Sequence, residues 1–221
     1  MIIAAVSDTH NHSYSVSPVD IFVHAGDLTV DGTQEELREA IKEIQKQPAI
    51  HKIVIAGNHD KIVENWNEFA RELFSLAGII YLQDEEVTVE GLRFYGSPYT
   101  LEYGYYSFML PRVGGEAIKK WEKIPTGIDV LITHGPPWGR FDVPFGHYSN
   151  VGDPDLMREL QRVKPQAHIF GHIHSPGDVV GADGVRYINA AQCNIMGGRY
   201  NKVYEPITFE LSPKGLPPLS S

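Results

Sequence analysis

The chain has 221 residues, enough for one domain with a sizeable core, and its shares of hydrophobic (42%) and charged (21%) residues are ordinary for a globular protein. Its formal charge of −9 argues against long nucleic acid as a partner, because a surface that follows the phosphate backbone has to be basic. No apolar run approaches the roughly 20 residues that cross a bilayer, so we expect no membrane partner. The single cysteine, Cys193, excludes an internal disulfide framework and favours a reducing compartment, so we expect a cytoplasmic protein.

The first half of the chain alternates strand and helix patterns. Short runs rich in β-branched residues, typical of buried strands, lie at Ile2–Val6, Asp20–Ala25 and Ile53–Ala56. Thr33–Glu36 has the form of a capping box and begins a predicted helix that Pro48 ends. A second helix is predicted over Glu64–Leu76. The strand-helix-strand order predicts parallel strands with a right-handed connection.

The second half is richer in strands and in irregular segments. Strands are predicted at Ile79–Leu82, Glu86–Val89, Leu92–Tyr95, Asp129–Thr133, His168–Phe170, Asp178–Ala182, Arg186–Asn189 and Ile207–Leu211. Short helices are predicted over Glu116–Lys123 and after Asp153, which has the pattern of an N-cap followed by a proline. Two long stretches, Pro98–Gly115 and Trp138–Gly152, lack either period and carry many aromatic residues. Long irregular segments of this kind are typical of functional loops.

This order of elements predicts an α/β fold with an α+β character, in which two β-sheets form a sandwich flanked by α-helices. No internal repeat or interdomain linker divides the chain. We therefore expect a single domain over residues 1–211, followed by a polar, proline-rich tail at residues 212–221.

Five of the predicted strands end in Asp, Asn or His, usually beside a glycine that lets the backbone turn sharply. The side chains in question are Asp8, His10, Asp27, Asn58, His59, Asp60, His134, His172 and His174. In open α/β sheets, ligands bind outside the carboxyl ends of the strands. The repetition therefore predicts one shared site at that edge.

These carboxylate, amide and imidazole groups form a mixed set of nitrogen and oxygen ligands. Such a set suits Mn²⁺ and Fe, with Zn²⁺ as an alternative, better than Ca²⁺, which prefers oxygen alone. The site has no thiolate, which argues against a structural zinc site. A set of this size is too large for one ion and suits two ions that share a bridging carboxylate. Such a pair stabilises both the attacking and the leaving oxygen of an in-line displacement.

The same residues resemble the motifs of a known family. Asp8–His10, Gly26–Asp27, Gly57–Asp60, Thr133–Pro137 and Gly171–His174 match, in order, those of the calcineurin-like metallophosphoesterases, and the similarity is greatest to the branch of small metallophosphoesterase-domain-containing proteins. The resemblance covers nearly the whole chain except the tail. It implies a metallophosphoesterase fold, a β-sandwich with flanking helices.

By motif position, the resemblance also implies a role for each residue. Asp8, His10 and His174 would hold one metal, whereas Asn58, His134 and His172 would hold the other. Asp27 would bridge the two ions. His59 would lie beside them as a proton donor. Asp60 stands where the branch often has Glu, and either carboxylate would accept a hydrogen bond from the imidazole.

The resulting hypothesis is a dinuclear metal-dependent phosphoesterase. A hydroxide that bridges two divalent or trivalent ions would attack phosphorus in line, and His59 would protonate the departing alkoxide. Asp60 would fix the tautomer of His59. The alternatives are a phosphomonoesterase, or a nucleotide-binding or scaffold protein whose activity is vestigial.

The two aromatic loops favour a small phosphodiester as the substrate. Aromatic faces stack flat organic groups, and the loops hold few cations to compensate the second charge of a monoester. The candidate contacts are His12, Tyr99, Tyr103 and Arg112. Cyclic nucleotides, notably 2′,3′-cyclic ones, are candidates that the family resemblance also suggests.

Overall fold

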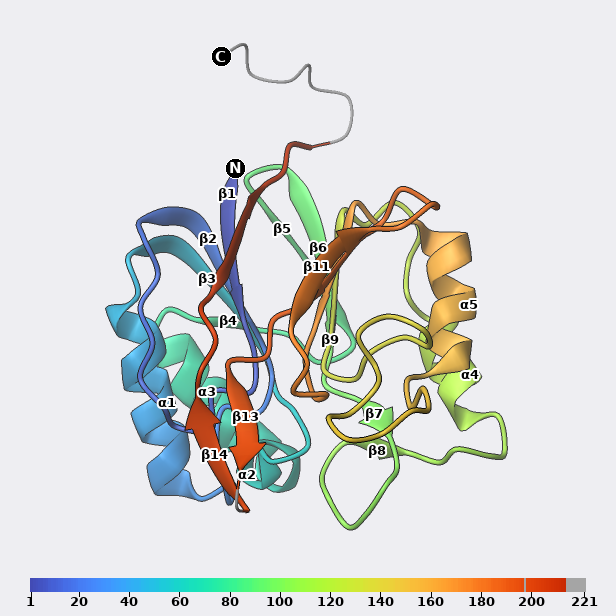
Figure 1. Cartoon of the computed structure of the whole chain (residues 1–221). Coiled ribbons are helices and arrows are strands. Elements are labelled where there is room, and N and C mark those ends of the chain that lie inside the picture. The colour runs from blue at the N-terminus through green and yellow to red at the C-terminus, as the bar shows by residue number, and fades with distance from the viewer. Residues whose placement is uncertain (197, 214–221) are drawn as a thin grey trace.

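The computed structural model describes residues 1–196 and 198–213, and consists of two β-sheets packed face to face with helices on their outer faces (Figure 1). The first sheet has the strand order β15-β1-β2-β3-β4. Its strands are β1 (Ile2–Val6), β2 (Val19–Ala25), β3 (Ala49–Ile55), β4 (Ile80–Tyr81) and β15 (Ile207–Glu210). β1 to β4 run parallel, and β15 is antiparallel to β1.

The second sheet has the order β11-β12-β10-β9-β6-β5. Its strands are β5 (Glu85–Val89), β6 (Leu92–Ser97), β9 (Val130–Thr133), β10 (Ala167–Phe170), β11 (Gly177–Val180) and β12 (Arg186–Asn189). The central four strands are parallel, and the outer strands β5 and β11 are antiparallel to their neighbours. Two short strand pairs lie outside these sheets: β7 (Thr100–Leu101) with β8 (Met109–Leu110), and β13 (Cys193–Met196) with β14 (Arg199–Lys202).

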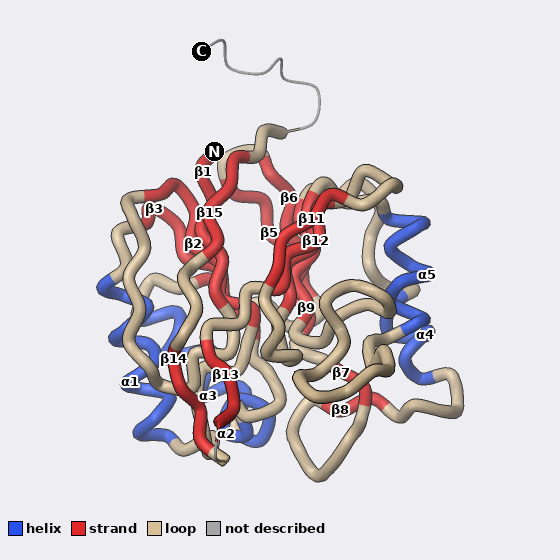
Figure 2. The backbone as a smooth tube through the Cα atoms, viewed as in Figure 1, coloured by secondary structure: helices blue, strands red, loops and turns tan. Residues whose placement is uncertain are grey.

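The helices cover the outer face of each sheet (Figure 2). They are α1 (Gln34–Lys46), α2 (Lys61–Asn65), α3 (Asn67–Leu76), α4 (Glu116–Trp121) and α5 (Pro154–Val163). The predicted capping box forms, because the Thr33 hydroxyl accepts from the Glu36 amide while the Glu36 carboxylate accepts from the Thr33 amide. None of the described helices combines the length and apolar character that a membrane crossing needs.

The predicted helix over residues 64–76 is divided in the structure at Trp66, whose φ of −130° and ψ of 55° are not helical. The Asn67 side-chain amide donates to the Val63 carbonyl at 3.1 Å, taking the acceptor that the next helical turn would use. The β13–β14 hairpin was not predicted from the sequence. The tail expected at residues 212–221 lies, from residue 214 onward, outside the described part of the chain.

The core consists of three apolar layers. Between the sheets, Ile3, Ile21 and Ile53 face Phe94, Ile132 and Ile169. Outside the first sheet, Leu37 and Ile44 of α1 and Phe74 of α3 pack against Phe22 and Val54. Outside the second, Trp121 of α4 and Leu156 of α5 pack against Leu131 and Phe170. The predicted sandwich is confirmed, and it sets the carboxyl ends of β1, β2, β3, β9 and β10 beside one another at one end of the molecule (Figure 1).

Candidate metal centre

The first group of side chains at this end comes from the loops after β1 and β10. Asp8, His10 and His174 place one ligand atom each within 4.8 Å of one another. His174 Nε2 lies 3.3 Å from Asp8 Oδ1. His10 Nδ1 faces the Thr29 carbonyl at 3.0 Å, so that nitrogen carries the proton and Nε2 keeps its lone pair. His10 Nε2 is buried without a hydrogen-bond partner among the described residues, as expected of a metal ligand.

The second group is centred on the amide oxygen of Asn58, in the loop after β3. This Oδ1 lies 2.9 Å from His134 Nε2 and 2.8 Å from His172 Nδ1. His134 Nδ1 donates to the Ala25 carbonyl at 2.9 Å, which aims Nε2 at the group. One oxygen and two imidazole nitrogens thus converge, a mixed set of ligands that suits a transition metal.

Asp27, at the end of β2, lies between the two groups. Its Oδ1 is 3.4 Å from His134 Nε2, and its Oδ2 is 3.9 Å from His10 Nε2. The two oxygens of one carboxylate therefore face different groups. Asp8, Asp27 and His134 also lie close enough to share an ion. The seven residues predicted as metal ligands are thus brought together, and their chemistry and convergence fit two ions with Asp27 between them.

The local backbone is bent to bring these side chains together. Asp8, Asp27 and His172 have φ values of 51°, 54° and 67°, in the left-handed region that residues with a β-carbon seldom adopt. A β-carbon at Gly57 would overlap the Asp27 carboxylate, and one at Gly171 would overlap that of Asp8. The glycines in these motifs are therefore required by close approach to the ligands.

The charges of these groups hold the carboxylates ionised. Burial alone would raise the pKa of Asp8, but the hydrogen bond and charge of His174 outweigh it and hold that pKa below its usual range. Burial opposes ionisation of Asp27 too, yet the charge of His134 and their hydrogen bond bring its pKa well below the ordinary value. Burial favours neutral His134, but the charge of Asp27 raises its pKa to about 9. Anionic carboxylates here suit cation binding.

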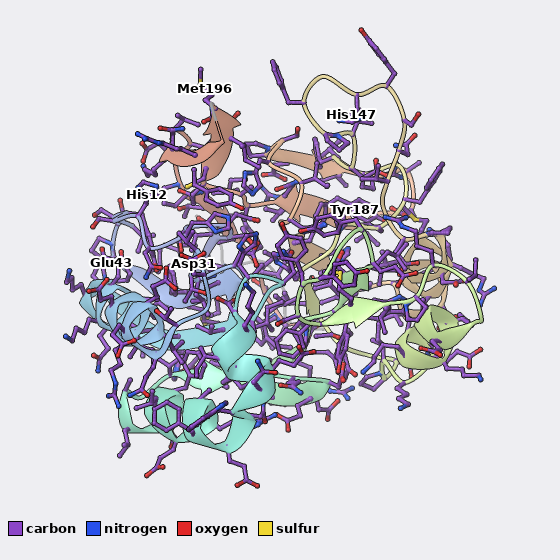
Figure 3. All side chains as sticks on the ribbon, turned by 90° about the horizontal axis from the view of Figure 1, so that it is seen from below. His12, Asp31, Glu43, His147, Tyr187 and Met196 are labelled. Atoms are coloured by element: carbon purple, nitrogen blue, oxygen red, sulfur yellow. The ribbon has the colours of Figure 1, made fainter. Side chains whose placement is uncertain are left out.

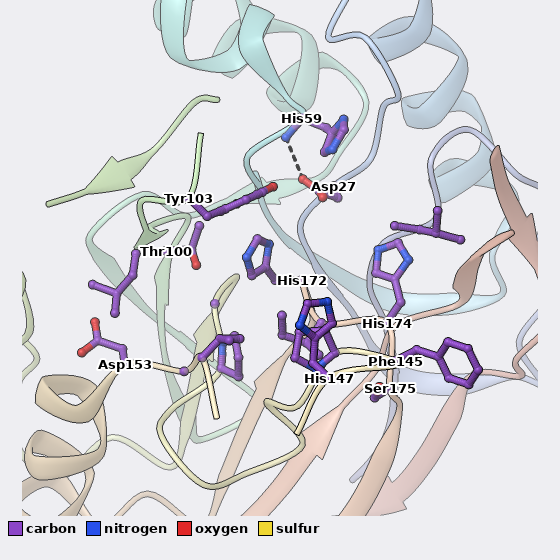
Figure 4. Close-up of a pocket in the computed structure, with 18 of the residues that line it drawn as sticks. Asp27, His59, Thr100, Tyr103, Phe145, His147, Asp153, His172, His174 and Ser175 are labelled. Atoms are coloured by element: carbon purple, nitrogen blue, oxygen red, sulfur yellow. Dashed lines mark hydrogen bonds between the residues drawn. The ribbon is translucent and has the colours of Figure 1, made fainter. Parts of the chain in front are cut away.

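His59 lies beside the ligands rather than among them. Its amide donates to Asp27 Oδ1 at 2.8 Å, which ties the two loops together. Its ring Nδ1 is 2.6 Å from the Val30 carbonyl and must donate to it, which leaves Nε2 to meet the Tyr200 hydroxyl at 2.9 Å. His59 and Tyr200 both line the cavity in front of the site, and His59 lies beside Asp27 there (Figure 4). An imidazole held in this way can exchange a proton through Nε2.

The structure corrects the expected contact between Asp60 and His59. The Asp60 carboxylate is fully buried and accepts from the Leu28, Thr29 and Gly57 amides and from the Thr29 hydroxyl. Burial and the nearby Asp27 charge raise the pKa of Asp60 to about 6. Asp60 therefore joins the loops after β2 and β3, and the Val30 carbonyl orients the imidazole in its place.

Comparison with known proteins identifies the family. The sequence matches the family described as calcineurin-like phosphoesterase over residues 1–176. The chain belongs to this family. It is 36% identical to human metallophosphoesterase domain-containing protein 1 over 93% of this chain and 69% of that protein. It is also 34% identical to a UPF0046 protein of Caenorhabditis elegans, over 97% of this chain and 76% of that protein.

Solved structures support the same fold. The phosphopantetheinyl hydrolase of Mycobacterium tuberculosis superposes with a TM-score of 0.56 at 16% identity, covering 86% of this chain and 88% of that one. The predicted metallophosphoesterase fold is thereby confirmed. As a calcineurin-like phosphoesterase, the chain is a metal-dependent phosphoester hydrolase, and the family implies a dinuclear divalent centre for which the grouped Asp and His side chains are the candidate ligands.

Of the four residues predicted to contact the substrate, three line one cavity and the fourth lies outside it. Tyr99, Tyr103 and Arg112 line a cavity of about 670 Å³ that also exposes Asp27 and His172. The Tyr103 hydroxyl accepts from the Asn58 side-chain amide at 2.8 Å. His12 does not line this cavity. Its Nε2 lies 3.0 Å from the Tyr200 carbonyl, so it supports β14 instead.

Sequence reasoning missed Tyr200 of β14. Its ring stacks on His10 with centroids 3.7 Å apart, and its hydroxyl is 2.9 Å from His59 Nε2. The sequence does carry a signal for this hairpin. Gly197-Gly198 separates the short segments Cys193–Met196 and Arg199–Lys202, and a glycine pair between two such segments is typical of a hairpin turn. Seen from the site end, Met196 at the end of β13 and His147 in the loop before α5 lie along the same edge of the molecule (Figure 3).

Proposed function

We propose that this phosphoesterase is a dinuclear phosphodiesterase that acts on small substrates. The observation that carries the proposal is the position of Asp27, whose two carboxylate oxygens face His134 and His10 in separate ligand groups. Asp8, His10 and His174 would hold one ion, and Asn58, His134 and His172 the other. Mn²⁺ and Fe suit these nitrogen and oxygen ligands, with Zn²⁺ as the alternative. When bound, the pair supplies an activated water and neutralises charge on the phosphoryl oxygens.

The residues around the ions would carry the proton. Hydrolysis of a diester breaks one P–O bond and yields a monoester and an alcohol, whose oxygen leaves as an alkoxide unless it is protonated. His59 lines the cavity and its Nδ1 is held by the Val30 carbonyl, so its protonated form would donate from Nε2 to the leaving oxygen. The Tyr200 hydroxyl lies 2.9 Å from the same nitrogen, so this contact would align the ring before the substrate binds, and the leaving oxygen would replace the hydroxyl as the partner of Nε2 during proton transfer.

A diester suits the cavity better than a monoester. Among the described residues that line it, Arg112 is the one lysine or arginine, and its side chain is exposed. Arg140, the other cation of the aromatic loops, stacks on Tyr187 at 4.7 Å and does not line the cavity. The second negative charge of a monoester would therefore find little compensation beyond the ions. Tyr99 and Tyr103 offer faces for a flat group, and 2′,3′-cyclic nucleotides remain the candidate substrates.

The test is a comparison of kcat/KM for bis(4-nitrophenyl) phosphate and 4-nitrophenyl phosphate on metal-analysed protein. We expect the diester to be preferred, and we expect Asp27→Ala to abolish both activities. A preference for the monoester would favour the phosphomonoesterase alternative. No turnover of either ester by protein that holds two metal equivalents would favour a binding or scaffold role.

A further inference from the structure

The cavity in front of the metal centre extends well beyond the ligands. Its volume of about 670 Å³ lies within the range of small-molecule sites and exceeds what a phosphoryl group needs. At one end are Asp27 and His59. Thr100 and Asp153 lie away from them, on the side of the cavity next to a helix (Figure 4). A substrate bound at the ligands would therefore leave this second end for another part of the molecule.

The walls of the second end are apolar. Leu101 of β7, Trp121 of α4 and Leu156 of α5 line it, and all three belong to the core layer outside the second sheet. Val151 adds a partly buried side chain from the loop before α5. The lining residues come from β7 in one aromatic loop, from the end of the other aromatic loop, and from the helices α4 and α5. The cavity therefore lies between the two aromatic loops and these helices. An apolar group placed there would be removed from water.

The polar groups at this end do not favour an anion. The buried Asp153 carboxylate accepts from the Trp121 indole at 2.7 Å and from the Leu156 amide at 3.1 Å. It therefore caps α5 and leaves no free helix N-terminus for a phosphate. Arg112 is exposed, and its Nε donates to the Glu102 carbonyl at 2.7 Å. A second phosphate or carboxylate here would meet a fixed carboxylate, and no buried lysine or arginine is among the described residues that line the cavity.

We propose that the end of the cavity formed by Leu101, Trp121, Val151 and Leu156 is a subsite for a flat, uncharged aromatic group on the substrate. A nucleobase belongs to this class, whereas a group with its own phosphate or carboxylate does not. The subsite rests on the proposed function, since the phosphoester would bind at the ligands. It adds the requirement that the organic part of the diester carry a neutral aromatic ring.

Three diesters with the same 4-nitrophenyl leaving group test the requirement, with methyl, phenyl or 4-carboxyphenyl as the second ester group. The metal-loaded full chain should show a kcat/KM for the phenyl diester about 10-fold or more above that of the methyl diester, because ring burial is favourable. The 4-carboxyphenyl diester should lose this advantage. Equal values for phenyl and methyl, or for phenyl and 4-carboxyphenyl, would overturn the subsite.

A matched pair of variants tests whether the preference for the phenyl diester arises at the second end of the cavity. Val151→Trp fills the second end from a partly buried position, so it should lower the ratio of kcat/KM for the phenyl diester to that for the methyl diester toward 1. Tyr148→Trp, in the same loop but exposed and outside the cavity lining, should leave this ratio unchanged. An unchanged phenyl-to-methyl ratio in Val151→Trp would contradict the location.

Calorimetry supplies a readout that does not depend on turnover. Phenylphosphonate should bind the metal-loaded protein more tightly than methylphosphonate, and Val151→Trp should remove the difference. If none of the diesters is hydrolysed, the proposed function fails, but the phosphonate ratio still decides the subsite. Equal binding of the two phosphonates to the unmodified protein would overturn the subsite alone.

Discussion

The Tyr200 hydroxyl lies 2.9 Å from Nε2 of His59, while the Tyr200 ring stacks on His10 at 3.7 Å between centroids. One side chain thus contacts both a candidate metal ligand and the candidate proton donor. Because the Val30 carbonyl already takes the proton on His59 Nδ1, the neutral ring accepts from the Tyr200 hydroxyl through Nε2. Tyr200 is therefore placed to align His59 without binding an ion.

Tyr200→Phe removes this hydrogen bond and keeps the stacked ring. We expect both metals to be retained and kcat to fall by about 2- to 10-fold, since one hydrogen bond contributes roughly 0.5–1.5 kcal/mol. The loss should be larger for alkyl than for nitrophenyl leaving groups, because only the former need full protonation. Kinetics on both substrates check this. The same loss for both leaving groups would assign Tyr200 a purely structural role.

Asp27→Ala should lose metal and activity together, because it removes the carboxylate between the two ligand groups. Asp142→Ala is the control: this carboxylate accepts from the Gly139 and Gly152 amides within its own loop, so the variant should keep both metals. Elemental analysis measures both. Two bound equivalents in Asp27→Ala protein would exclude a bridging role.

His59→Ala should keep a metal content near that of the unmodified protein and lower kcat by about 10²- to 10⁴-fold, the usual contribution of a general acid. The decrease should again be smaller for nitrophenyl than for alkyl leaving groups. Steady-state kinetics on protein of known metal content give the answer. Metal loss in His59→Ala would instead make it a ligand.

Asp60→Ala should act through stability rather than proton transfer. It leaves the buried amides of Leu28, Thr29 and Gly57 without their acceptor, so we expect the free energy of unfolding to fall by about 2–4 kcal/mol. His59→Ala, at the preceding position, should change the free energy of unfolding by much less. Urea unfolding compares the two variants. Equal stability of Asp60→Ala and the unmodified protein would contradict the loop-joining role.

The protein should lose stability in mild acid. Burial lowers the pKa of His168 to about 3, so below about pH 6.5 the unfolded chain binds a proton that the folded chain does not. Stability then falls as pH falls, by about 1.4 kcal/mol per pH unit for this group, down to its folded pKa. Urea unfolding at pH 7 and pH 5, with a chelator present, measures the slope. His168→Gln should reduce it, whereas His147→Gln, at an exposed position, should not.

Much of the fold could be predicted because its signals are local. The capping box at Thr33 and the apolar strand runs each depend on neighbouring residues. The candidate ligands could be predicted for a similar reason, since they directly follow strands whose parallel order brings their carboxyl ends together. The break at Trp66 was missed because it depends on one side-chain bond, from Asn67 to the Val63 carbonyl.

The surroundings of His59 depended on contacts between residues far apart in the chain. Asp60 is adjacent to His59 in sequence, yet the turn directs its carboxylate into the amides of Leu28 and Thr29 and leaves the imidazole to the Val30 carbonyl. Tyr200 is 141 residues away and contacts His59 because the β13–β14 hairpin lies over the site. Residue patterns in the sequence predict which strands form and which side chains follow their carboxyl ends. Side-chain direction across loops is set by packing and by backbone hydrogen bonds from elsewhere in the fold, which no short stretch of sequence encodes.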